Sequence, residues 1–149
     1  MKKINHSYFM PVILMLCAAL APAFIYAQSI AENVLDDVLI SKIDFTGIVK
    51  IKFRLPVRYI SHSPKGMASK VRIKVDVISK LRNEIKNEEF SIRESIVPQY
   101  SQSFGLEEVI YETVGRDNYI TLYFEKDVSF EIVPDPGYRS LNVILHGVK

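Results

Sequence analysis

The chain has 149 residues, 48% of them hydrophobic, and carries 19 Lys and Arg against 17 Asp and Glu. This length suits one domain with a packed core, and the near balance of charges excludes a uniformly basic nucleic-acid binder. Cys17 is the only cysteine, so no internal disulfide can form and stability has to come from packing.

The first 27 residues have the pattern of a secretory signal peptide. Lys2 and Lys3 form a positive start, residues 10–24 are uncharged and apolar, and Ala27 supplies the small residue at a cleavage position. We therefore expect an exported, periplasmic protein with a signal peptide (1–27), a flexible leader (28–37) and one domain (38–149), without a membrane span after cleavage. The alternative is an uncleaved anchor, because the apolar stretch nears the roughly 18 to 20 residues that span a bilayer.

A clear alternation of apolar and polar residues runs from residue 49 to residue 59. It predicts a strand with one apolar face and one cationic face, the latter formed by Lys50, Lys52, Arg54 and Arg58. Pro56 lies inside the run and has no N–H group, so we expect a sheet edge or a break in the strand there.

The next segments predict a hairpin and then a less regular connection. Residues 61–69 have turn composition, and alternation resumes at 71–77 with Arg72 and Lys74 on the polar side, which indicates an antiparallel hairpin. After it, the spacing of Ile78, Leu81 and Ile85 predicts a turn or two of helix. Pro98 and the polar residues that follow it prevent a longer one.

The last third of the chain predicts further short strands, at residues 107–114, 118–124, 128–133 and 139–146. The segments that separate them have turn chemistry, at residues 115–117, 125–127 and 134–137. With one more strand at residues 39–45, the pattern gives about seven strands. We therefore expect an all-β fold, a small antiparallel β-sandwich or a partly open barrel, with one short helix at most, in residues 78–100.

The residues that could support catalysis do not form a recognisable set. Ser61, His62 and Ser63 lack the glycine-flanked turn of a hydrolase nucleophile, and His62 and His146 lie far apart for a metal site. Paired carboxylates at residues 36–37, 88–89 and 107–108 are more typical of solvated charge, although a small secreted hydrolase is an alternative. We expect no enzymatic activity, no metal and no cofactor.

The cationic strand faces are the main candidate for binding. If the predicted hairpin pairs them side by side, they merge into one basic patch, and a ligand would offset the repulsion between like charges. The alternative is a solvated outer face that discourages pairing at a sheet edge. Tyr59 and Tyr138 are available to stack on a sugar or an extended peptide, and packing in the core or at its rim is the alternative. The candidate ligand-binding residues are Lys52, Arg54, Arg58, Tyr59, Arg72 and Arg139.

Two regions of the chain carry a family resemblance. The run Val57-Arg58-Tyr59 through Pro64, and the closing pair of segments at residues 128–132 and 138–145, where Arg139-Ser140-Leu141 begins the last strand, resemble the AMIN-type domains of bacterial cell-envelope proteins. The form they are similar to stands at the N-terminus of secreted proteins with tetratricopeptide or SPOR segments. The resemblance implies a compact β-sandwich that binds peptidoglycan or an envelope protein and has no catalytic residues. The chain departs from that pattern by ending four residues after Leu145, without the accompanying portion.

The sequence therefore predicts an exported, non-catalytic binding module of the bacterial cell envelope, with peptidoglycan or an envelope protein as its partner. A second interpretation is an accessory subunit of an envelope assembly that pairs through an exposed strand edge.

Overall fold

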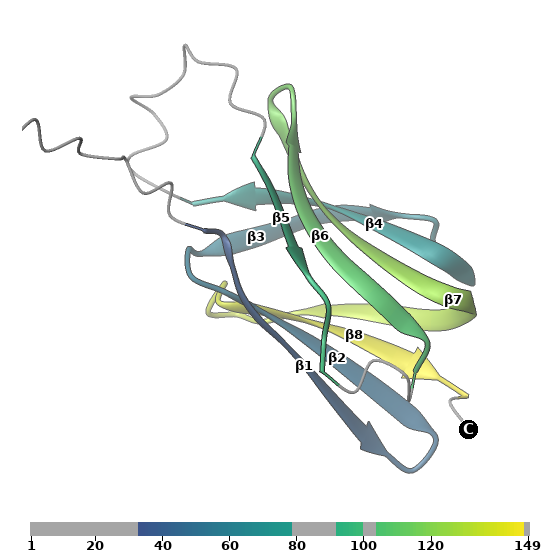
Figure 1. Cartoon of the computed structure of the whole chain (residues 1–149). Coiled ribbons are helices and arrows are strands. Elements are labelled where there is room, and N and C mark those ends of the chain that lie inside the picture. The colour runs from purple at the N-terminus through teal and green to yellow at the C-terminus, as the bar shows by residue number, and fades with distance from the viewer. Residues whose placement is uncertain (1–32, 79–91, 100–103, 148–149) are drawn as a thin grey trace, which may run out of the picture. The chain divides into compact units, whose positions relative to one another are not determined.

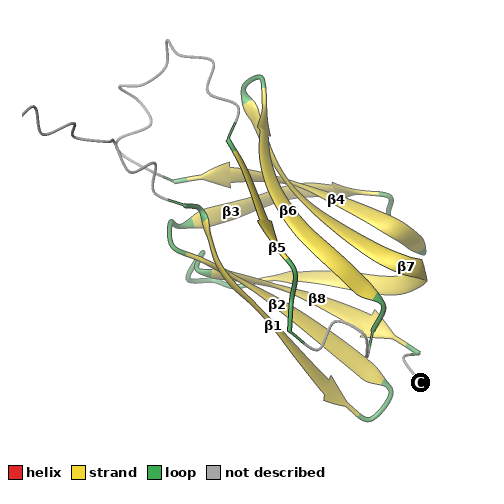
Figure 2. Ribbon diagram, in the orientation of Figure 1, coloured by secondary structure: helices red, strands yellow, loops and turns green. Residues whose placement is uncertain are grey.

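The computed structural model describes residues 33–78, 92–99 and 104–147, and every regular element in these residues is a β-strand (Figures 1 and 2). The expected all-β antiparallel fold is confirmed, with eight strands in place of about seven. The expected signal peptide lies outside the described residues, as do Leu81 and Ile85 of the expected helix. The strands are β1 (Leu35–Ile43), β2 (Thr46–Phe53), β3 (Val57–Ser63), β4 (Ala68–Val77), β5 (Arg93–Ile96), β6 (Leu106–Val114), β7 (Asp117–Pro134) and β8 (Ser140–His146).

All eight strands belong to one hydrogen-bonded sheet that folds over into two layers (Figure 1). The first layer contains β1, β2, β8 and the second half of β7, in that order. The second layer contains β3, β4, the first half of β7, β6 and β5. Strand β7 is common to both layers and connects them.

The chain also passes between the layers where β2 ends and β3 begins. The single alternating run predicted for residues 49–59 is divided there, because β2 ends at Phe53 and β3 starts at Val57. The predicted break at Pro56 is therefore confirmed. Pro56 cannot donate a hydrogen bond, but its carbonyl accepts one from the N–H of Ile78 at 2.8 Å.

The turn predicted at residues 125–127 is wrong, because β7 continues through them without interruption. Glu125, Lys126 and Asp127 are all exposed. They lie between the half of β7 that pairs with β4 and β6 and the half that pairs with β8. The charged side chains mark the place where the strand leaves one layer for the other and its side chains reach water.

The start of the domain also differs from the prediction. Strand β1 begins at Leu35, inside the expected leader, and Val34 and Leu35 are each only 3% exposed. Both of their N–H groups donate to the carboxylate of Glu94, at 2.8 Å each. Glu94 belongs to β5, a four-residue strand that the sequence did not predict. The domain therefore begins near Val34, four residues before the expected boundary at Val38.

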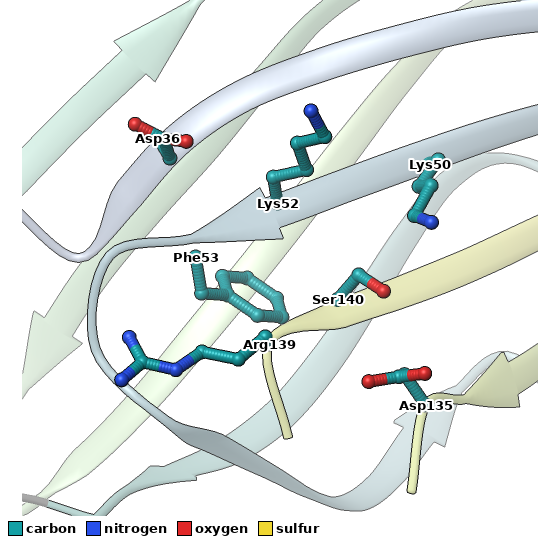
Figure 3. A pocket seen from close by; sticks show the side chains of 7 residues that line it. All are labelled: Asp36, Lys50, Lys52, Phe53, Asp135, Arg139 and Ser140. Carbon is teal, nitrogen blue, oxygen red and sulfur yellow. The ribbon is translucent and has the colours of Figure 1, made fainter. Parts of the chain in front are cut away.

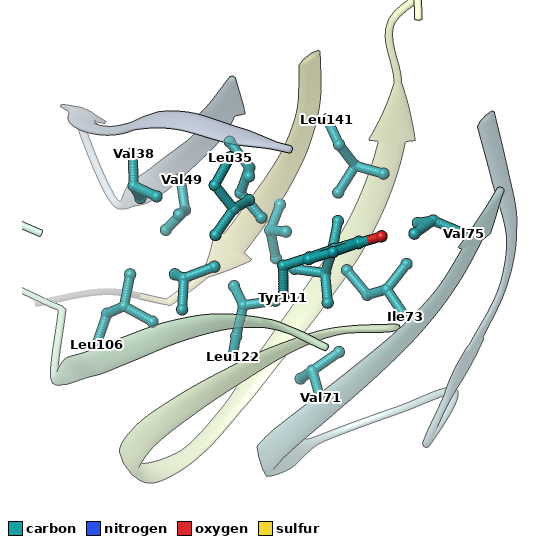
Figure 4. Close-up of a cluster of buried hydrophobic side chains, with 14 of the residues drawn as sticks. Leu35, Val38, Val49, Val71, Ile73, Val75, Leu106, Tyr111, Leu122 and Leu141 are labelled. Atoms are coloured by element: carbon teal, nitrogen blue, oxygen red, sulfur yellow. The ribbon is translucent and has the colours of Figure 1, made fainter. Parts of the chain in front are cut away.

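The core between the layers is formed by the alternating apolar rows of the strands (Figure 4). Val71, Ile73, Val75 and Val77 of β4 are all buried, as the period of two predicted. Burying one such side chain contributes roughly 1.5–3 kcal/mol. Tyr111 lies across the middle of this core, and its hydroxyl donates to Oδ1 of the buried Asn118 at 2.9 Å.

Candidate functional site

The cationic residues predicted to form one patch lie on two separate layers. Strand β2, which carries Lys50 and Lys52, pairs with β1 and β8. Strand β4, which carries Arg72, pairs with β3 and β7. The predicted merging of these residues by a hairpin is therefore wrong. The physical reason is the break at Pro56, which sends only the second half of the alternating run to the partner strand β4.

On the second layer, the three cations predicted for the patch, Arg58, Arg72 and Lys74, are paired with carboxylates. Nη2 of Arg58 lies 2.6 Å from Oδ2 of Asp76, and Nη2 of Arg72 lies 3.0 Å from Oε1 of Glu112. The guanidinium of Arg72 also covers the ring of Tyr119, 3.9 Å from its centre. These contacts balance the charges of Arg58 and Arg72, so this part of the predicted patch matches the alternative of a solvated outer face.

Lys74, the third of these predicted cations, is paired as well. Its Nζ lies 2.8 Å from Oδ2 of Asp117. The hydrogen bond with Asp117 raises the pKa of Lys74 above its ordinary value, and the same bond lowers the pKa of Asp117.

The two aromatic candidates have different surroundings. Tyr59 packs against the core and its hydroxyl is 2.7 Å from Nδ1 of His62, so its ring is largely occupied by packing. Partial burial raises the pKa of Tyr59. Burial, and then the nearby charge of Lys65, lower the pKa of His62, which keeps that imidazole neutral near pH 7. Tyr138, in contrast, is 45% exposed in the turn between β7 and β8.

On the first layer, a hollow of about 380 Å³ opens beside the end of β2 (Figure 3). We call it the basic hollow, because three of its lining side chains, Lys50, Lys52 and Arg139, are cationic. The complete lining is Asp36, Lys50, Lys52, Phe53, Asp135, Arg139 and Ser140.

Strand register brings these residues together from distant parts of the sequence. Lys52 of β2 lies opposite Ser140 of β8 and, on its other side, opposite Asp37 of β1. Arg139 directly precedes β8, and its carbonyl accepts a hydrogen bond from the N–H of Phe53 at 2.9 Å. The guanidinium of Arg139 donates to the backbone carbonyl of Arg54, which fixes its position without neutralising its charge.

Within the described residues, neither acidic side chain at the basic hollow forms an ion pair with one of its lysines. Oδ1 of Asp36 accepts from Nε of Arg54 at 3.3 Å, and Oδ2 of Asp135 accepts from the N–H of Gly137 at 3.1 Å. Within the described part of the chain, no ion pair joins Lys50 or Lys52 to a carboxylate. The hollow therefore presents unbalanced positive charge to solvent, as an anion-binding surface requires.

Of the predicted binding residues, Lys52 and Arg139 line the basic hollow. Arg54 borders it, because its side chain contacts Asp36 and its carbonyl accepts a hydrogen bond from Arg139. Arg58, Tyr59 and Arg72 lie on the second layer. Sequence reasoning missed the contribution of Asp36, Asp135 and Ser140. Residues 36–37 were assigned to the leader and Asp135 to a turn, so only the pairing of β1, β2 and β8 could have revealed them.

Other kinds of site find no support in the described residues. They contain no group of three or more His, Cys, Asp and Glu side chains placed to hold a metal ion. A helix with the length and apolar character needed to cross a membrane is also absent from them. Comparison with known proteins gave no match to a family model, to a curated protein or to a solved structure.

Proposed function

We propose that this protein is a non-catalytic binding module of the bacterial cell envelope that holds an anionic group of peptidoglycan, or of an envelope protein, in the basic hollow. One observation carries this proposal: among the described residues no ion pair joins Lys50 or Lys52 to a carboxylate, and both line the hollow with Arg139, which a backbone carbonyl holds in place. Lysine and arginine side chains arranged in this way bind carboxylate and phosphate oxygens through charge-assisted hydrogen bonds.

The cellular setting of this proposal comes from the sequence. The charged start, apolar run and small residue of residues 1–27 favour export, and the resemblance to AMIN-type domains favours the cell wall as the place of binding. Peptidoglycan carries carboxylates on its peptides, so the wall supplies a ligand of the required charge.

The test is retention of the purified protein by purified peptidoglycan sacculi at low and at high salt. We expect the unmodified protein to be retained at low salt and released as salt screens the charges. The variant Lys50→Glu/Lys52→Glu should bind roughly tenfold more weakly or worse, which corresponds to about 1.4 kcal/mol. The matched control is Lys65→Glu/Lys126→Glu, which makes the same charge change at exposed positions outside the hollow and should bind normally.

Two results would contradict the wall-binding function. One is negligible retention of the unmodified protein at every salt concentration. The other is equal retention of the hollow variant and the control variant, because binding would then depend on total charge and not on the basic hollow.

A second candidate function is assembly with another protein chain by strand addition. The observation that favours it is the open sheet, in which β1, β3, β5 and the second half of β7 each have one edge without a neighbouring strand in the described residues. Such an edge offers unpaired N–H and C=O groups to an added strand. Charged substitutions on the exposed side of an edge strand test this function, because they would prevent assembly and leave the fold intact.

A further inference from the structure

The edges of β3, β5 and the second half of β7 are poorly suited to pairing with another chain. The second half of β7 follows the exposed charged residues 125–127 and ends at Pro134. Strand β3 has an irregularity between Tyr59 and Ser61 and is followed directly by Pro64. Strand β5 has only four residues, and Pro98 follows two positions later. Bulges, prolines and short length are the features by which proteins protect sheet edges from intermolecular pairing.

The edge of β1 lacks these features over most of its length. The strand has nine residues, and its one irregularity lies at the start, between Leu35 and Asp37. From Val38 to Ile43 every residue pairs regularly with β2, and Lys42 is the only charged residue among the six. A regular strand of β-branched and apolar residues with so little charge is a surface on which a further strand can add.

Large apolar side chains are exposed along the same strand. Leu39 is 43% exposed and Ile43 is 61% exposed, and both lie with Ser41 on the outer face of the layer, away from the core. Phe45, in the turn that follows, is 73% exposed. Apolar side chains beside an unprotected edge indicate a surface that another chain covers.

The order of residues along this outer row identifies the chain that fits it. Leu39 and Ile43 lie symmetrically on either side of Ser41, so the row is complementary to a copy of itself that runs in the opposite direction. Centring such a pair on Ser41 places Leu39 opposite Ile43 of the second copy, Ser41 opposite Ser41, and Ile40 opposite Lys42. A centre at Leu39 would include the irregular start of β1 in the pair, and a centre at Ile43 would include the turn that follows the strand. A centre at Lys42 would place the two Lys42 side chains opposite each other, and a centre at Ile40 would place Asp36 opposite Asp44. Like charges facing each other across a strand pair are destabilising.

We propose that β1 pairs antiparallel with β1 of a second copy of this chain, centred on Ser41, to form a two-fold symmetric dimer. The first layers of the two copies then form one continuous sheet, with Leu39 and Ile43 of each copy covering those of the other. A pairing of strands this short buries less than the roughly 1,200–2,000 Å² of stable interfaces. The dimer is therefore weak and concentration-dependent, with a dissociation constant in roughly the micromolar range.

The dimer would present two basic hollows on one surface. The symmetry axis of such a strand pair is perpendicular to the sheet, so both outer faces point the same way. With strands about 4.8 Å apart and residues about 3.4 Å apart, the Cα atoms of the two Lys50 residues lie about 20 Å from each other. A polymer with repeated anionic groups could occupy both hollows, and the second contact would then form at high effective concentration. This consequence rests on the proposed function of the hollow, whereas the dimer itself does not.

The first experiment is sedimentation equilibrium over a range of protein concentrations. We expect a reversible monomer–dimer equilibrium for the unmodified protein and at least a tenfold weaker one for Leu39→Lys/Ile43→Lys, which places lysines opposite each other. The matched control, Met67→Lys/Val114→Lys, changes two exposed apolar residues away from β1 and should dimerise normally. Circular dichroism confirms that all variants remain folded.

The second experiment tests the register by oxidative cross-linking in a Cys17→Ser background. Residues facing each other in an antiparallel pair have Cα atoms about 4.5–5.5 Å apart, within the range of a disulfide. Ser41→Cys should therefore give a covalent dimer. Lys42→Cys should not, because its two copies would be offset along the strands.

A purely monomeric protein, or a dimer unaffected by Leu39→Lys/Ile43→Lys, would overturn self-pairing. Cross-linking by Lys42→Cys and not by Ser41→Cys would overturn the register. A monomer whose β1 edge binds a strand of a different protein would overturn self-pairing in favour of the second candidate function. Retention of a monomeric protein by sacculi would overturn the dimer alone, whereas a dimer that sacculi do not retain would overturn only the function of the hollow.

Discussion

At the scale of single residues, the contact between Gly47 and Phe104 shows how a missing side chain shapes the core. Gly47 is buried in the inward-facing row of β2, next to Val49 and Ile51. A Cβ atom placed on Gly47 would lie 2.6 Å from Cε1 of Phe104 and 3.4 Å from Cβ of Leu145. The Phe104 ring, only 9% exposed, therefore occupies the space that a side chain at position 47 would need.

We predict that Gly47→Ala destabilises the protein by about 1–3 kcal/mol, because the added methyl group forces the buried Phe104 ring out of its position. Unfolding in urea, monitored by circular dichroism, measures the effect. Gly66→Ala is the control, since nothing lies within 4 Å of a Cβ at that position, and it should leave stability unchanged or slightly higher. If Gly47→Ala costs the same in a Phe104→Leu background as in the unmodified protein, the contact with the ring is not the cause.

At the scale of strands, the ion pair between Lys74 and Asp117 connects β4 to the start of β7. The ion pair lowers the pKa of Asp117. The contribution of the pair to stability is therefore present above the pKa that Asp117 has in the unfolded chain, and it is lost as pH falls through the lower pKa that Asp117 has in the folded protein. Because the pair raises the pKa of Lys74, the contribution is also present below the unfolded pKa of lysine and is lost as pH rises through the folded value.

We therefore predict that Asp117→Asn flattens the dependence of stability on pH at both ends of the range. The unmodified protein should lose stability below about pH 4 and above about pH 10.5, and the variant should lose less in each range. Urea unfolding at about pH 3, 7 and 11.5 measures this, with the exposed Asp127→Asn as a control that should behave like the unmodified protein. Identical pH profiles for Asp117→Asn and the unmodified protein would contradict the role of the pair.

The sequence predicted the strands whose local pattern is strong and missed those that depend on distant contacts. The alternating rows of β4 and β8 were recognised because one face of each strand is apolar and buried. Strand β5 is too short to show a pattern, and the start of β1 is hidden by its acidic residues, although Glu94 and the core hold Val34 and Leu35 in place. In β7, the charged residues at the corner between layers have the composition of a turn and gave a wrong prediction.

The site was predicted only in part for a related reason. The cationic character of Lys52 is visible in the sequence, and Arg139 was named as a candidate. Which cations remain unpaired depends on how the strands are placed. Arg72 of β4, for example, pairs with Glu112 of β6, which lies 40 residues away in the sequence. The distribution of free and neutralised charge therefore appears only once the strands are placed.

At the scale of the whole molecule, the two layers form one cooperative unit. The first half of β7 is hydrogen-bonded to β4 and β6, and its second half is hydrogen-bonded to β8. One continuous core lies between the layers, with buried residues from both, such as Ile73, Leu122 and Val143. Neither layer can open without exposing the apolar face of the other.

We predict that the domain unfolds in a single transition, with coincident curves from circular dichroism and tyrosine fluorescence. Native-state hydrogen exchange should be slowest for central amides of both layers, such as those of Ile120 in β7 and Val143 in β8, with similar opening free energies. The amides of β5 should exchange faster, because that strand is short and pairs on one side only. Two separate transitions, or one layer exchanging long before the other, would contradict this.

The continuity of β7 also restricts how the length of this polypeptide can change during evolution. Ile120, Leu122 and Phe124 on one side of the corner, and Phe130 on the other, are buried at positions of the same parity. A single inserted or deleted codon between Glu125 and Asp127 would shift one half of the strand by one residue and turn its side chains to the opposite face. A change of two codons would preserve the alternation, so relatives of this protein should differ at the corner by even numbers of residues.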